Sequence, residues 1–336
     1  MTMPPTTPLD PLESVPKISL SAGPTPLHSA PRLASELGLA ELWLKRDDLI
    51  AFGLGGNKVR GLEWILADAL EHGADTLVTG AGTLSNHVRA CAATAAYQGM
   101  SCSAIYWGQP PERSQGNHRL VEMLGANVRF TGDANRESVD TALEVEADYI
   151  RSRGGRPYVI PRGGACPHGV LGHVAAVREL LVQTSSSGCR PDKIILAVGS
   201  GGTLAGWLLG SRLFGAPWRV EGITVSRPVT DVVGQVAFLA SEAAARFGLN
   251  ATVAEHDIVI HDGFIGPGYG IPSTEGNAAV ALAARTEGVF LDPTYTGKAF
   301  AALMHLAQEG YFHGRSVLFI HSGGAPTLFV DSRGQS

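Results

Sequence analysis

The chain has 336 residues, which is enough for one large domain or two closely packed ones and excludes a peptide-sized or disulfide-stapled scaffold. It carries 26 Lys and Arg against 31 Asp and Glu, and no segment forms the basic stripe that a nucleic acid backbone needs, so we expect no nucleic acid partner. The four cysteines show no C-x-x-C spacing and no apolar run approaches the ~20 residues of a membrane span, so we expect a cytoplasmic protein without a membrane partner.

Residues 1–16 contain five prolines and no Lys or Arg, unlike a targeting peptide, and we expect a loose leading arm there. From residue 42 onward, short apolar runs alternate with segments of helical period, which predicts an α/β protein with helices on both faces of parallel sheets. The predicted strands are Leu42–Lys45, Thr76–Thr79, Ser103–Tyr106, Val128–Thr131, Tyr158–Ile160, Lys193–Val198, Val220–Val225, Asp257–Ile260 and Ser316–Ile320. The predicted helices are Lys58–Glu71, Ser85–Gln98, Gly116–Leu124, Arg136–Arg153, Gly169–Leu181, Thr203–Leu213, Val232–Phe247, Ser273–Thr286 and Gly297–Glu309.

These nine strands are more than one open sheet of this size usually carries. We therefore expect two lobes, each built on an open twisted sheet, with a ligand cleft between them. Thr184–Pro191 (TSSSGCRP) is predicted to be a connector.

A glycine-rich turn, ending in Gly55-Gly56-Asn57-Lys58, precedes the first predicted helix. A lysine at a helix N-terminus sits against the positive end of the helix dipole, which disfavours the ammonium form and lowers the pKa of the amine. Lys58 is therefore suited to form a Schiff base with a carbonyl compound. The alternative is a solvated surface lysine.

A second glycine-rich turn, Gly199–Thr203 (GSGGT), follows an apolar strand and opens another predicted helix. Consecutive backbone N–H groups at a helix N-terminus can hold a phosphate. The turn matches neither the P-loop nor the G-x-G-x-x-G signature, so a phosphate-bearing cofactor fits better than a dinucleotide. A plain strand-to-helix turn is the alternative.

Polar side chains also gather at one helix start and in two loops. Ser85, Asn86 and His87 stand together at a predicted helix N-terminus, where N-capping alone would also account for the serine and asparagine. Tyr269 and Tyr295 lie in loops rich in glycine, proline and threonine, where no packing period explains them. We expect these two phenols to face a ligand.

Five motifs, taken together, resemble one family: GGNK, SNH-x-R, GSGGT, Y-x-G-K and HSGGAP. Their order and spacing, from Pro26 to Phe329, are similar to those of the D-cysteine desulfhydrase and 1-aminocyclopropane-1-carboxylate deaminase group of pyridoxal-phosphate enzymes. The resemblance implies the tryptophan-synthase-β-like fold (fold type II), a pyridoxal 5′-phosphate cofactor, a small amino-acid substrate, no metal and a homodimer.

The resemblance also implies how the cofactor is held. Lys58 would bind its aldehyde covalently, Asn86 would hydrogen-bond the 3′ oxygen of the pyridoxal ring, and Ser322 would face the pyridine nitrogen. The phosphate would be held by Gly199, Ser200, Gly201, Gly202 and Thr203.

For the substrate, the resemblance implies that Ser85 and the backbone around Asn86 and His87 receive the carboxylate. Tyr269 and Tyr295 would flank the substrate side chain and assist at the leaving group. The catalytic residues are then Lys58, which takes or returns the Cα proton, with Tyr295, Tyr269 and Ser85.

Two differences within the group favour one activity. The deaminases carry an acid after the tyrosine where this chain has Thr296, and HSGGAP is closer to the desulfhydrase sequence H-T-G-G-A-P. A hydroxyl near the pyridine nitrogen leaves the ring less electron-withdrawing than a carboxylate would, which suits β-elimination. We expect α,β-elimination to a 2-oxo acid and ammonia, with D-cysteine as the default substrate and a sulfonated or otherwise anionic analogue as a further candidate.

Three alternatives stay open at this point: ring-opening deamination of the cyclopropane amino acid, β-replacement or another pyridoxal reaction in a specialised biosynthetic pathway, and non-enzymatic amino-acid binding, which requires Lys58 to be idle.

The chain also departs from the family at Leu84, where glutamine is usual, and at Arg162-Gly163-Gly164-Ala165-Cys166, where V-G-G-S-N is usual.

Arg162 stands between the proposed lobes. It is a surface residue, a structural fork to a carboxylate in the other lobe, or a substrate-binding anchor for a second anionic group. We expect a large cofactor-binding domain of residues 1–54 and 168–336 and a small domain of residues 55–167.

Overall fold

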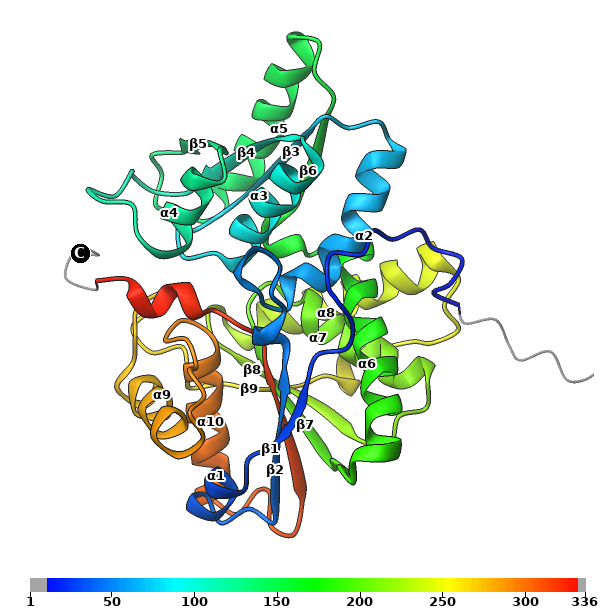
Figure 1. Cartoon of the computed structure of the whole chain (residues 1–336), viewed down its shortest axis with the longest axis vertical. Helices are drawn as coiled ribbons and strands as arrows, with labels where there is room; N and C mark the ends of the chain where they lie inside the picture. Colours follow the sequence, from blue (N-terminus) through cyan, green and yellow to red (C-terminus); the bar gives the residue numbers. More distant parts are fainter. Residues whose placement is uncertain (1–10, 332–336) are drawn as a thin grey trace, which may run out of the picture.

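The computed structural model of the chain describes residues 11–331, and its strands form two separate sheets (Figure 1). The larger sheet has the order β1-β2-β10-β7-β8-β9, with every neighbouring pair parallel except β1 and β2. The smaller sheet is parallel, in the order β5-β4-β3-β6. The strands are β1 (Leu27–Ser29), β2 (Glu41–Arg46), β3 (Thr76–Ala81), β4 (Ser101–Tyr106), β5 (Asn127–Phe130), β6 (Pro157–Ile160), β7 (Lys193–Val198), β8 (Arg219–Thr224), β9 (Val259–His261) and β10 (Ser316–His321).

Helices cover both faces of each sheet, as the alternation in the sequence predicts. Along β7, Ile194 and Leu196 face the core under α6, α7 and α8, whereas Ile195 faces the core under α1, α9 and α10. In the smaller sheet, Leu77 packs toward α2 and α3 and Val78 toward α5. The helices are α1 (Pro31–Glu36), α2 (Lys58–Glu71), α3 (Asn86–Gln98), α4 (Gly116–Met123), α5 (Ser138–Ser152), α6 (Pro167–Ser187), α7 (Gly202–Leu213), α8 (Val229–Phe247), α9 (Thr274–Glu287) and α10 (Thr296–Gln308). The predicted α/β class with open sheets is confirmed.

Short elements and chain ends differ most from the predictions. The strand β1 and the helix α1 were not predicted, because three and six residues are too few to show a period. Residues 184–187 of the predicted connector continue α6. Residues 1–10 of the predicted arm lie outside the described residues, whereas Leu12, which belongs to the same arm, is buried in the core. Beyond the arm, the Leu20 N–H donates to Glu63 Oε1 at 2.8 Å. The two domain boundaries and the homodimer stay predictions.

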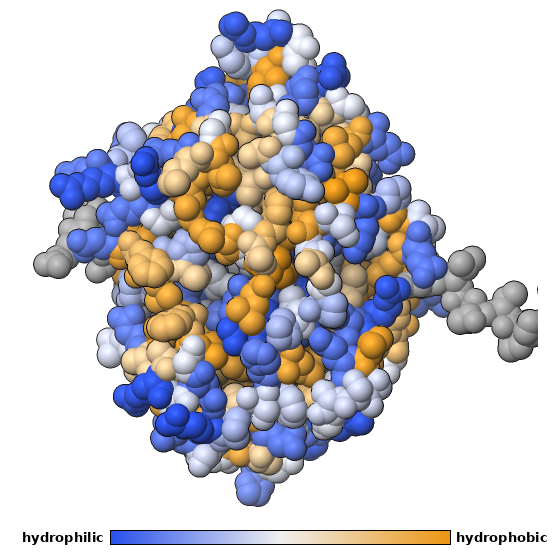
Figure 2. All heavy atoms as spheres, viewed as in Figure 1, coloured by the Kyte–Doolittle hydropathy of each residue, from blue (hydrophilic) through white to orange (hydrophobic). Residues whose placement is uncertain are grey.

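Figure 2 shows apolar side chains gathered toward the middle of one face of the molecule, with hydrophilic residues around its upper and lower ends. Within residues 11–331, every helix is too short or too polar to cross a bilayer.

Helices α2 and α6 approach each other closely through glycines, and this contact fixes the direction in which α2 leaves the cleft. A Cβ on Gly61 would lie 2.8 Å from the carbonyl oxygen and 3.1 Å from the Cα of Gly169. Backbone atoms cannot move aside as a flexible side chain can. The two helices therefore require glycine at this crossing.

We expect Gly61→Ala to destabilise the protein by about 1–3 kcal/mol, since the added methyl group must push α2 and α6 apart. The measurement is the urea midpoint of unfolding. Gly234→Ala is the matched control, because a Cβ on this α8 glycine would have its nearest neighbour, Glu255 Oε1, at 3.7 Å. The control should unfold at the same or a higher urea concentration. Equal midpoints for the two variants would show that the crossing tolerates a side chain.

Candidate active site

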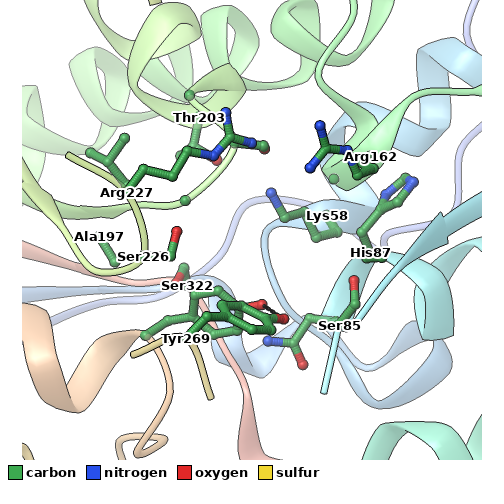
Figure 3. A pocket seen from close by; sticks show the side chains of 18 of the residues that line it. Lys58, Ser85, His87, Arg162, Ala197, Thr203, Ser226, Arg227, Tyr269 and Ser322 are labelled. Carbon is green, nitrogen blue, oxygen red and sulfur yellow. Dashed lines mark hydrogen bonds between the residues drawn. The ribbon is translucent and has the colours of Figure 1, made fainter. Parts of the chain in front are cut away.

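A cavity lies between the two sheets, where the parallel strands of both end (Figure 3). It measures about 840 Å³ with its open mouth included, which is within the range of small-molecule sites. Its lining contains one lysine and three arginines but no Asp or Glu among the described residues, so the cavity suits anions. It gathers nearly all of the predicted site residues: Lys58, Ser85, Asn86, His87, Arg162, Gly199, Ser200, Gly201, Thr203, Tyr269, Tyr295 and Ser322. Gly202 is buried directly behind Gly201 as the first residue of α7.

Lys58 begins α2 after the glycine-rich turn. Gly55 and Gly56 have φ angles of +76° and +99°, in the left-handed region that favours glycine, and the chain turns there so that the lysine side chain enters the cavity. Within residues 11–331 its amine has no hydrogen-bond or ion-pair partner. Burial lowers the pKa of Lys58 to about 8, so its neutral amine is more populated near neutral pH than that of an exposed lysine. This placement differs from that of a solvated surface lysine.

The turn before Lys58 packs against the end of β10. The Asn57 N–H donates to the Ser322 carbonyl oxygen at 2.9 Å, and a Cβ on Gly323 would lie 2.7 Å from the Gly56 Cα. Glycine at both positions lets the two backbones pass. Ser322 follows β10 of the larger sheet, far from Lys58 in the sequence, and this contact places both residues in the lining of the same cavity.

A buried ionic network fixes the first turn of α2. The Arg60 guanidinium donates to Asp47 at 2.8 and 3.0 Å and to Glu179 at 2.9 and 3.0 Å. Lys45 pairs with Glu179 as well. Although burial opposes ionisation, the Arg60 charge holds the pKa of Asp47 and of Glu179 below their usual ranges. Both carboxylates are thus committed to Arg60 and Lys45, and neither lines the cavity.

The glycine-rich turn after β7 fits a phosphate. Gly201 has φ of +92° and caps α7, whose first N–H groups have no acceptor within the helix. The Ser200 Oγ is buried without a hydrogen-bond partner among the described residues. The Thr203 hydroxyl already accepts from Asn57 Nδ2 at 3.0 Å. An oxyanion at this turn would satisfy both the Ser200 hydroxyl and the free backbone donors.

The start of α3 fits a carboxylate. Ser85 is its N-cap and accepts from the Val88 N–H at 3.3 Å, so the capping role considered from the sequence is real. His87 donates from Nε2 to the Thr79 hydroxyl at 3.1 Å, since that hydroxyl itself donates to Ile160 O. Burial and the Lys58 charge lower the pKa of His87 to about 3, so the ring stays neutral and committed to this contact. Its backbone N–H remains at the positive end of the helix.

Asn86 has its orientation set by two residues of the small sheet region. Asn117 Nδ2 donates to Asn86 Oδ1 at 2.9 Å, while Asn117 Oδ1 accepts from Arg89 Nε at 2.7 Å. The carbonyl end of Asn86 is therefore occupied. Its amide nitrogen is left as the donor that lines the cavity, as a contact to a ring oxygen requires.

Tyr269 and Tyr295 form a hydrogen-bonded pair in the cavity, with 2.6 Å between their hydroxyl oxygens. Burial raises the pKa of Tyr269 to about 12 and that of Tyr295 well above its usual value. Trp107 packs edge-on against Tyr269, and Gly82 leaves the space for both rings. Both phenols are therefore neutral near neutral pH and can donate a proton.

Lys298, the lysine of the Y-x-G-K motif, holds the loop that carries Tyr269. Its side chain is fully buried, and its Nζ donates to the carbonyl oxygens of Ile265 at 2.7 Å and Gly268 at 2.8 Å. The motif that contains Tyr295 thus also holds the loop of Tyr269 through Lys298. The sequence alone shows the motif but not this function of its lysine.

Arg162 lies at the cavity wall and forms a two-pronged ion pair with Asp140, at 2.6 Å from both Nε and Nη2. The structure shows a fork, but the predicted partner in the other lobe is wrong, because Asp140 belongs to α5 of the same small-sheet region as Arg162. A role in substrate binding stays a prediction.

Several lining residues escape the sequence analysis. Asn57 could have been found, because it stands inside the GGNK motif. The others are single residues beyond the ends of strands or before a helix, where no pattern marks them. These missed residues are Asn57, Trp107, Arg136, Ser226 and Arg227.

Comparisons with known proteins agree with this geometry. A family described as "Pyridoxal-phosphate dependent enzyme" matches residues 18–323. A D-cysteine desulfhydrase of Salmonella typhi is 40% identical over 329 residues, 96% of this chain and 98% of that protein. A Pyrococcus abyssi protein named "Putative 1-aminocyclopropane-1-carboxylate deaminase" is 41% identical over 319 residues, 95% of this chain and 94% of its own. A crystal structure of an ACC deaminase homologue superposes with a TM-score of 0.88 at 35% identity and covers 95% of both chains.

A buried lysine amine, a glycine-rich turn that fits a phosphate and a cavity between two α/β sheets are consistent with the enzyme class that these comparisons show, one that uses pyridoxal phosphate. The chain belongs to the pyridoxal-phosphate-dependent enzyme family, within its group of D-cysteine desulfhydrases and 1-aminocyclopropane-1-carboxylate deaminases. It is of the fold type II class that the sequence motifs predict.

We expect Lys298→Met to reduce amino-acid turnover by about 10²-fold, because the Tyr269 loop loses its two anchoring hydrogen bonds and the phenol pair separates. Cofactor binding, followed by its visible absorbance, should change less than threefold, since Lys298 lies outside the cavity lining. Tyr269→Phe, which removes one hydroxyl of the pair directly, shows how much turnover falls when the pair is lost. Turnover close to that of the unaltered enzyme in Lys298→Met would show that the loop needs no such anchor.

Proposed function

We propose that the enzyme catalyses α,β-elimination on a small amino acid that resembles D-cysteine, giving a 2-oxo acid and ammonia; a sulfonated or otherwise anionic analogue is a further candidate substrate. One observation carries the proposal. The amine of Lys58, which has no partner within residues 11–331, lines the same cavity as the neutral phenols of Tyr269 and Tyr295, whose hydroxyl oxygens are hydrogen-bonded at 2.6 Å. A base at Cα and an acid for the leaving group are the two groups that an elimination needs.

The protein groups that would hold pyridoxal phosphate match its chemistry. Lys58 would bind the aldehyde, the Gly199–Thr203 turn the phosphate, Asn86 the 3′ oxygen and Ser322 the pyridine nitrogen. The support for these roles is that, within residues 11–331, the Ser200 hydroxyl, the amide nitrogen of Asn86 and the amine of Lys58 have no hydrogen-bond partner. Bound pyridoxal phosphate supplies the electron sink for the Cα electron pair.

In the proposed reaction the substrate carboxylate binds at Ser85 and the first backbone N–H groups of α3. Lys58 Nζ removes the Cα proton, the bond from Cβ to the leaving group breaks, and the tyrosine pair donates a proton to the departing group. One water then completes the balance, so that the amino acid yields a 2-oxo acid, ammonia and the protonated leaving group.

Ring-opening deamination of the cyclopropane amino acid is the second candidate, and one observation favours keeping it. Thr296, whose neutral side chain distinguishes this chain from the deaminases, is fully buried and bonded to Asp292 Oδ1 at 2.7 Å. It does not line the cavity. The difference at this position therefore acts on the cavity only through the loop that carries Tyr295.

We expect borohydride to abolish the visible band of the holoenzyme and peptide mapping to locate the reduced cofactor on Lys58, the lysine whose unpaired amine lines the cavity. Lys58→Ala should give no stable adduct. A label on Lys45, Lys193 or Lys298 would refute the assignment, and so would the absence of a band after reconstitution.

The reaction itself is tested with a panel of D-cysteine, L-cysteine, cysteate, chloroalanine and the cyclopropane acid, scored for 2-oxo acid and ammonia together. We expect equal amounts of both products from D-cysteine or cysteate, because elimination releases them in a one-to-one ratio. Product from the cyclopropane acid alone would instead establish the deaminase reaction. With an added thiol as the nucleophile, release of sulfide from D-cysteine or of sulfite from cysteate without 2-oxo acid and ammonia would indicate β-replacement.

A further inference from the structure

Three arginines from three separate segments meet at the wall of the cavity. Arg136 precedes α5, Arg162 follows β6 and Arg227 follows β8, and all three line the cavity together with Lys58. In Figure 3 the guanidinium groups of Arg162 and Arg227 point toward one another, on either side of the Lys58 amine in this view. The cluster therefore joins both sheets across the cleft.

The cluster has less negative charge around it than positive charge. Arg162 is paired with Asp140, whereas among the described residues Arg136 donates only to the neutral Ser226 carbonyl oxygen, at 3.1 Å. The other carboxylate whose charge acts on Arg227 is that of Asp231, which is exposed. The guanidinium of Arg227 has no hydrogen bond or ion pair within residues 11–331. Burial, followed by the charges of Arg162 and Arg136, lowers the pKa of Arg227, although the charges of Asp140 and Asp231 oppose this change. Like charges gathered this closely cost free energy unless an anion binds between them.

The anion has two chemical sources, the cofactor phosphate and the substrate. The loop that carries Arg162 lies next to the Gly199–Thr203 turn, since a Cβ on Gly163 would lie 2.5 Å from Ser200 Oγ. That turn, however, already offers a helix N-terminus and a free hydroxyl to the phosphate. Arg136 lies close enough to Tyr269 for its charge to oppose the rise in the pKa of that phenol. The cluster thus reaches the tyrosines, where the substrate side chain is proposed to lie.

We propose that Arg136 and Arg227, with Arg162 held beside them by Asp140, form an oxyanion subsite that selects amino acids carrying a second negative group, a carboxylate or a sulfonate, on the side chain. The inference rests on the proposed function for the orientation of the substrate in the cavity. A planar guanidinium offers paired donors that match either group.

The test compares aspartate with asparagine, in both enantiomers, because these amino acids share a shape and differ in one charge. Their affinities for the holoenzyme are read from the change in its visible absorbance at equilibrium, which requires no turnover. We expect aspartate to bind at least tenfold more tightly than asparagine, and Arg227→Gln to reduce that ratio at least tenfold. Arg136→Gln should reduce it as well. The affinities for asparagine and for the cofactor should change less than threefold.

Arg119→Gln is the matched control, since this α4 arginine is exposed and lies outside the cavity lining. Arg227→Lys is the second variant if Arg227→Gln does not fold, because it keeps the charge and loses the paired donors. It should retain part of the preference for aspartate. Equal binding of aspartate and asparagine to the unaltered enzyme would overturn the proposal. Loss of cofactor affinity in Arg227→Gln, with the preference unchanged, would assign the cluster to the phosphate instead.

The outcome is separable from that of the proposed reaction. D-Cysteine has no second carboxylate or sulfonate, so its elimination tests the reaction without the subsite. If D-cysteine is not eliminated but aspartate still binds more tightly than asparagine, the proposed function is refuted and the subsite is supported. If D-cysteine is eliminated but aspartate and asparagine bind equally, only the subsite is refuted.

Discussion

The position of the Lys58 amine depends on the ionic network that Arg60 forms two residues later. Breaking a buried pair by removing one partner leaves an uncompensated charge, which is far more costly than losing a surface ion pair. Asp47 and Glu179 therefore fix the first turn of α2 to the end of β2 and to α6. Because these carboxylates are used there, the nearby Lys58 amine enters the cavity without a counter-charge and with a lowered pKa.

The same arrangement separates the acidic groups of the protein from its cavity. The chain carries a formal net charge of −5, yet among the described residues the side chains that line the cavity are cationic or neutral. Asp292 illustrates the separation, since its oxygens accept from the backbone of Thr294, Tyr295 and Thr296 and hold the start of α10. A phosphate-bearing cofactor and an amino-acid carboxylate both suit such a cavity. Asp47, Glu179 and Asp292 thus position segments next to the cavity and do not line it.

The lysine and the phenols come from opposite ends of the chain, and neutral contacts bring them together. Glycines at Gly56 and Gly323 allow the turn before Lys58 to pass the end of β10. Lys298 holds the Tyr269 loop through two carbonyl oxygens, and the Tyr295 hydroxyl then completes the pair. Each contact is short and directional, so a small shift of one loop changes the distance between the base and the acid.

The sequence by itself determined the α/β class, the long helices and the motifs, because apolar period and glycine-rich turns are local properties that survive without a structure. GGNK, GSGGT and HSGGAP predicted Lys58, the turn proposed to hold the phosphate and Ser322 as site residues in this way, and all three motifs contribute to the lining of one cavity. Only the tertiary structure decided that Arg162 pairs with Asp140, that Thr296 faces Asp292, and that Arg136 and Arg227 join the cavity wall. The physical reason is that these side chains act through neighbours distant in sequence, and a lone arginine or threonine in a loop carries no periodic signal of the partner it will meet.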